Sequence, residues 1–131
     1  MTEIEKEVWS QAQLFIWRIP KKNHDAMMKL QKQFNDINIK HGVLRIEVFQ
    51  LTNTDTYDGC TNIFNTVSAK QDEEIWVELQ SHRNLKQMDE VTSEVMKDEN
   101  MQAEGQLVKQ FMDLVTPGSG MIMGKFTRLG I

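Results

Sequence analysis

Three charged residues on two predicted strands are the first candidates for chemistry. Arg45 and Glu47 lie in the stretch VLRIEVFQL, and Glu78 lies in EIWVELQ. Strand alternation places all three on faces that mix charged and apolar side chains. Charges inside a sheet need partners, so one interpretation pairs Arg45 with Glu47 or Glu78 across a dimer interface. In the other, Arg45 holds a substrate carboxylate or enolate while a glutamate moves the proton.

The histidines and the cysteine offer little further chemistry. His24, His41 and His82 are too far apart in sequence for metal-ligand spacing, and Cys60 has no second cysteine beside it. We therefore expect no metal site and no cofactor. His82 follows the third predicted strand, at the rim where a cavity would open, so it is either an acid or base for a bound substrate or a capping residue. The sequence contains no P-loop, G-x-G-x-x-G, nucleophile elbow or H-E-x-x-H motif.

Length and charge restrict the class of protein. The 131 residues suit one domain over 1–131, with residues 1–10 as a flexible arm. A net charge of −4 argues against nucleic acid as a partner, and the apolar runs are too short to span a membrane. A single cysteine and an acidic N-terminus predict a cytoplasmic location.

The hydrophobic pattern alternates between strand and helix periods. Strands are predicted at 13–19, 43–51, 74–80 and 121–129, and weakly at 62–69; helices are predicted at 24–41, from an N-cap at Ser81 to Met96, and at 101–114. Pro20 ends the first strand, and Gly42 follows the first helix. A glycine inside the last strand predicts a bulge or a close approach by another group.

This order predicts an α+β fold, the ferredoxin-like βαββαβ plait, with an antiparallel sheet and its helices on one face. Ile75, Val77 and Leu79 form an apolar face that we expect the helices to cover. Phe49 and Trp76, with Phe15 or Trp17, would then lie on the uncovered face. Exposed aromatic patches usually mark interfaces, so the pattern predicts a homodimer.

Nine methionines are a high count for this length. Methionine fills irregular cores and also suits surfaces that bind apolar ligands. Both interpretations remain open from the sequence.

Several short motifs together resemble the dimeric α/β-barrel superfamily and, within it, a YbaA-like family of unknown function. They are Pro20 before a helix, HGVLRI at 41–46, Asp58–Gly59, VMKDENM at 95–101 and MIMGKF at 121–126. The resemblance covers about Phe15 to Phe126. Leu79 and His82 depart from it, because the family has tryptophan and tyrosine there.

The resemblance implies a homodimer packed sheet to sheet and a cavity between sheet and helices, without implying a reaction. One predicted function is the binding or transformation of a small apolar or aromatic metabolite, as a mere binder or as a cofactor-free oxygenase or isomerase. The alternative is a non-enzymatic dimeric scaffold or stress-related interaction module with the cavity packed shut. Haem degradation is a third possibility, with no histidine convincingly placed as axial ligand.

Overall fold

The computed structural model describes residues 9–131, so most of the predicted arm lies outside the described residues. The strands are β1 (Gln11–Pro20), β2 (Arg45–Gln50), β3 (Glu73–His82) and β4 (Ile122–Thr127). The α-helices are α2 (His24–Lys40), α3 (Ile63–Thr66), α4 (Leu85–Lys97) and α5 (Gln106–Leu114), and short 3₁₀ turns occur at Lys21–Asn23 and Glu99–Met101. Within the described residues, no helix is long and apolar enough to cross a membrane.

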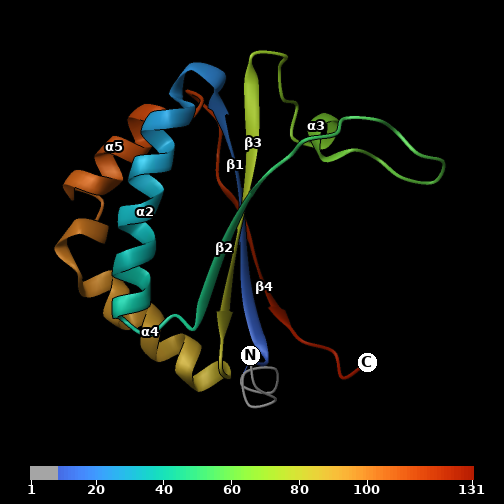
Figure 1. Ribbon diagram of the computed structural model, residues 1–131. Helices are drawn as coiled ribbons and strands as arrows, with labels where there is room; N and C mark the ends of the chain where they lie inside the picture. The colour runs from blue at the N-terminus through green and yellow to red at the C-terminus, as the bar shows by residue number, and fades with distance from the viewer. Residues whose placement is uncertain (1–8) are drawn as a thin grey trace.

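The strands form one antiparallel sheet in the order β2-β3-β1-β4. Helices α2, α4 and α5 lie on one side of this sheet, whereas α3 and its flanking loop project from the other side (Figure 1). This arrangement confirms the predicted ferredoxin-like α+β fold.

Helix α2 shows how the local sequence sets an element. Met27, Leu30 and Phe34 recur at three- and four-residue steps, and all three are buried. The helix ends before Gly42, whose φ of 108° is open to glycine and strained for other residues. The Gly42 carbonyl then accepts a hydrogen bond from Gln87 Nε2 at 2.6 Å, which ties the helix end to α4.

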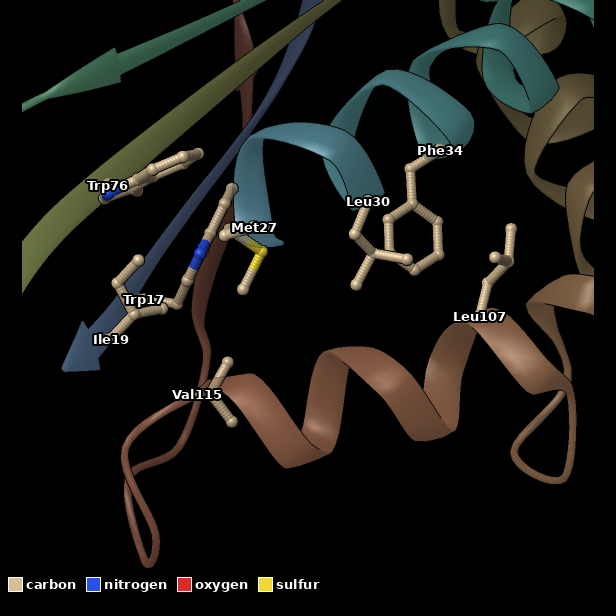
Figure 2. Packing of buried hydrophobic residues seen from close by; sticks show 8 residues of the cluster. All are labelled: Trp17, Ile19, Met27, Leu30, Phe34, Trp76, Leu107 and Val115. Carbon is tan, nitrogen blue, oxygen red and sulfur yellow. The ribbon is translucent and has the colours of Figure 1, made fainter. Parts of the chain in front are cut away.

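The main core fills the space between the sheet, α2 and α5. Trp17 of β1 and Trp76 of β3 lie with ring centroids 6.2 Å apart. Leu30 and Phe34 of α2 point toward Leu107 of α5 (Figure 2). Truncating a buried leucine or phenylalanine of this kind costs roughly 2–5 kcal/mol.

The predicted faces of β3 were wrong. Trp76, predicted at the dimer interface, is only 2% exposed and packs in the core against Trp17. The register places Phe15 opposite Glu78, so the helix-covered face of β3 carries Trp76, Glu78, Gln80 and His82. Ile75, Val77 and Leu79 therefore belong to the opposite face. Trp17 and Phe15 also lie on the helix side, because both contribute to the main core.

Three local predictions also need correction. The weak strand at 62–69 is helix α3, whose N-terminus is capped by the Asn62 side chain accepting from Phe64 N at 2.8 Å. The cap of α4 is Asn84, whose Oδ1 accepts from Gln87 N, because β3 continues through the predicted cap Ser81 to His82. Helix α5 is also shorter than predicted and follows the turn at Glu99–Met101.

The sheet face opposite the helices, which we call the outer face, is mostly apolar and largely uncovered. Phe49 is 54% exposed and Ile122 is 47% exposed. Helix α3 and its loop project on this side of the sheet (Figure 1). A groove of about 350 Å³ lies there, lined by Phe49, Gln50, Leu51, Thr52, Asn53, Ile63, Ile75 and Val77. Gly124 of β4 also lies on the outer face. A Cβ on it would lie 3.0 Å from the Phe126 ring, which confirms the predicted close approach by another group.

Candidate ligand-binding cavity

A cavity of about 470 Å³ lies between the helix-covered face of the sheet and helices α2, α4 and α5. This volume is in the range of small-molecule sites. Its polar lining comes mainly from alternate residues of β1 and β3 and from one face of α2: Gln13, Gln31, Asn38, Glu78, Gln80 and His82. The rest of the wall is mostly apolar.

Glu78 lies at the centre of the polar lining and is 7% exposed. Gln31 Nε2 of α2 donates to its Oε1 at 2.6 Å, and Gln80 Nε2 of β3 donates to its Oε2 at 2.6 Å. Gln31 is itself oriented by a hydrogen bond from the same Nε2 to Asn35 Oδ1 at 2.9 Å. Burial raises the pKa of the Glu78 carboxyl above its ordinary value, while the two amide donors act in the opposite direction. No Lys or Arg forms an ion pair with Glu78 within residues 9–131.

His82 ends β3 at another part of the same wall and has no exposed surface. Neither ring nitrogen has a hydrogen-bond partner among the described residues. Burial lowers the pKa of the imidazole, and the charge of Lys125 on β4 lowers it further. Both effects favour the neutral form of the ring.

Aromatic and methionine side chains form the apolar wall. The Phe111 ring of α5 lies 5.8 Å from Trp17 and 6.0 Å from Phe34, in both cases edge to face. Met96 and Met112 are largely exposed yet line the cavity, so they mark its solvent side. Met27 and Met88, by contrast, are buried, as the core interpretation of the methionines predicts.

The structure separates the predicted site residues into two groups. Glu78 and His82 line the cavity, whereas Arg45 and Glu47 lie on the outer face, where their side chains form an ion pair at 3.2 Å. The predicted pairing of Arg45 with Glu47 thus occurs, although within one chain. An Arg45 clamp acting with Glu78 is wrong, because the sheet lies between the two side chains.

The other histidines and the cysteine lie outside the cavity. His24 Nδ1 is 2.7 Å from Glu74 Oε1, and His41 Nε2 is 3.0 Å from Asp98 Oδ2. The hydrogen bond with His41 lowers the pKa of the Asp98 carboxyl. Cys60 is exposed in the loop before α3. Residues 9–131 contain no group of three or more potential metal ligands.

Sequence reasoning missed the contribution of α2 to the cavity. Gln31 and Asn38 fall on the same helical stripe as Met27 and Phe34, at steps of three and four residues. Two buried amides on an otherwise apolar stripe are the signal that could have indicated a polar-lined cavity.

Comparison with known proteins places this chain in a family. The profile of a family described as "Protein of unknown function (DUF1428)" matches residues 11–113. The chain belongs to the DUF1428 family. The match includes Glu78, His82 and Gln31 but ends within α5, before β4. No curated protein matches the sequence.

Solved structures with the same fold are distant in sequence. A NIPSNAP-family protein of unknown function from Agrobacterium tumefaciens is 14% identical with a TM-score of 0.54, covering 94% of this DUF1428 chain and 93% of that one. A second structure of that protein has a TM-score of 0.56 at 13% identity, covering 88% of this chain and 90% of that one. HapK from Hahella chejuensis is 12% identical with a TM-score of 0.51, and the coverage is 92% and 94%. At such identities the similarity shows the fold alone; the narrower YbaA-like resemblance stays a prediction.

Proposed function

We propose that this DUF1428 protein binds a small apolar or aromatic molecule in the cavity between its sheet and its helices. The observation that carries the proposal is the cavity itself, about 470 Å³ with apolar walls and a few convergent polar groups. The alternative is a scaffold with its cavity packed shut. It has less support, because a packed core leaves few voids larger than a water molecule, whereas this cavity measures about 470 Å³.

The methionines provide a direct test. We would label the methionine methyl groups with ¹³C and titrate the protein with toluene. Toluene bound in the cavity shifts the methyl signals of Met96, Met101, Met112 and Met121, which line it. Met28 provides the control, because it is 44% exposed on α2 and does not line the cavity.

Equal shifts at Met28 and at the cavity methionines would indicate unspecific surface binding and would contradict the proposal. A variant with a smaller cavity provides a second test. Val108 of α5 lines the cavity and is only partly buried, so Val108→Phe adds a ring there without replacing a residue of the main core. The shifts should then become smaller, because the larger side chain takes up part of the cavity.

We further propose that the protein acts as a homodimer through the outer face. The support is the apolar character of that face, where Leu14, Ile16, Val77 and Leu79 lie beside the exposed Phe49, Ile122 and Phe126. A two-fold dimer buries the same patch on both copies. Sedimentation equilibrium at micromolar concentration tests this, and a mass near 15.3 kDa would refute it.

A further inference from the structure

We propose that the cavity selects a ligand with a positively charged nitrogen on an apolar body, and that Glu78 is the counter-ion of this nitrogen. This inference rests on the proposed function, because it names the class of molecule that the same cavity takes. It follows from the carboxylate of Glu78 in the cavity wall and from the absence of Lys and Arg in the described lining.

The first observation is an unbalanced acidic group. Glu78 is buried, and its two hydrogen bonds come from the neutral amides of Gln31 and Gln80. An ionised carboxylate away from water is costly unless a cation faces it. A carboxylate also has about four acceptor sites for its two oxygens, so it can still accept from an ammonium group after accepting from both amides.

The second observation is that the described lining holds no cation to balance Glu78. It contains no Lys or Arg, and its only basic side chain is His82. That imidazole is kept neutral by burial and by Lys125, which is an exposed residue on β4. An anionic ligand would therefore bring a second negative charge beside Glu78 in a poorly solvated space, whereas a cation would neutralise the first.

The third observation is the aromatic wall beside the carboxylate. Phe15 lies directly opposite Glu78 in the β1–β3 register, and Trp17, Phe34 and Phe111 line the same cavity. Aromatic faces attract ammonium groups through their quadrupole, and the attraction is stronger where water is excluded. Carboxylate and rings together favour an amine over an alcohol or an acid of the same shape.

Three probes that share a 2-phenylethyl body and differ in charge test the inference near neutral pH: 2-phenylethylamine, 2-phenylethanol and 3-phenylpropionate. Binding is followed through the cavity methionine methyls. We expect the amine to bind at least about tenfold more tightly than the alcohol, which corresponds to about 1.4 kcal/mol of added attraction. The propionate should bind most weakly.

The matched variant is Glu78→Gln, which keeps the side-chain shape and removes the charge. Its amine-to-alcohol preference should fall several-fold, to the part that the aromatic rings supply, and circular dichroism would establish that it is folded. A second measurement needs no variant. Because burial raises the pKa of Glu78 above its ordinary value and a bound cation would lower it, amine binding at a pH near 4.5 should release protons. Calorimetry in two buffers of different ionisation enthalpy measures this release, which the alcohol should not cause.

The outcomes separate this inference from the proposed function. The cation inference fails, while ligand binding stands, if the alcohol or the propionate binds to wild type as tightly as the amine. It also fails if Glu78→Gln keeps the full wild-type preference for the amine. If none of the three probes shifts the cavity methionines, the proposed function fails and the inference fails with it.

Discussion

Substitution of Ile122 by alanine should weaken the proposed dimer without disturbing the fold. Ile122 lies on the outer face and is 47% exposed in the single chain. Full burial of an isoleucine contributes about 1.5–3 kcal/mol, so covering the exposed half contributes about 1 kcal/mol per side chain. A two-fold interface contains the residue twice, which gives about 2 kcal/mol per dimer, or roughly a thirtyfold rise in the dissociation constant.

The chain contains a matched control for this experiment. Ile39 is 49% exposed, but it lies on α2, on the other side of the sheet. Ile39→Ala removes the same atoms at the same exposure and should leave the dissociation constant unchanged. Sedimentation equilibrium of both variants over a concentration series measures the difference. An equal effect of the two substitutions, or no effect of either, would refute the assignment of the outer face to the dimer.

Three further predictions concern single side chains. Glu78→Gln should gain stability relative to wild type as the pH rises above 4.5, because a raised pKa in the folded state makes ionisation of Glu78 destabilising. The gain is about 1.4 kcal/mol per unit by which the pKa is raised. A difference in unfolding free energy between the two proteins, measured in urea, that stays constant across pH would contradict this. His82→Leu should gain stability relative to wild type as the pH falls below 6.5, since the lowered pKa means that protonation opposes folding; a pH-independent difference in urea midpoint would argue against it. Gly42→Ala should cost about 1–3 kcal/mol, because φ is 108° and the new Cβ would lie 3.1 Å from Val91 Cγ2. An unchanged thermal midpoint would show that the helix end relaxes freely.

The sequence predicted most elements because their signals are local. Helix α2 was placed within one residue at its C-terminal end, since the apolar period, Asp25 in the first turn and Gly42 after the last turn all agree. Prediction of α3 failed because Ile63, Phe64 and Val67 suit a strand, whereas the Asn62 cap favours a helical turn.

The faces of β3 show where sequence reasoning fails. Both of its faces carry large apolar side chains, so alternation divides the residues into two sets without showing which set the helices cover. The face with Trp76 and Glu78 was predicted to point outward because the other face, with Ile75, Val77 and Leu79, is wholly apolar. It points inward because Glu78, Gln80 and His82 line a cavity and the first two hydrogen-bond to each other. The pairing of Phe15 with Glu78 joins residues far apart in sequence, and no local pattern encodes it.

Arg45 was grouped with Glu78 for the same reason. Its strand alternation was predicted correctly, since Ile46 and Val48 contact the helix-side clusters. The error was to assign Glu78 to the face of Arg45. The candidate cavity could thus be predicted only in part: His82 was expected at its rim, whereas Glu78 was named but assigned to the outer face, and Gln31 and the aromatic wall were missed.

The central claim, that the cavity holds a small molecule, is tested most directly by native mass spectrometry of freshly purified wild type beside Val108→Phe. We predict that wild type carries an additional mass that is released on denaturation, and that Val108→Phe carries less of it. Wild type without any additional mass, or an added mass that is equally abundant on both proteins, would contradict the claim.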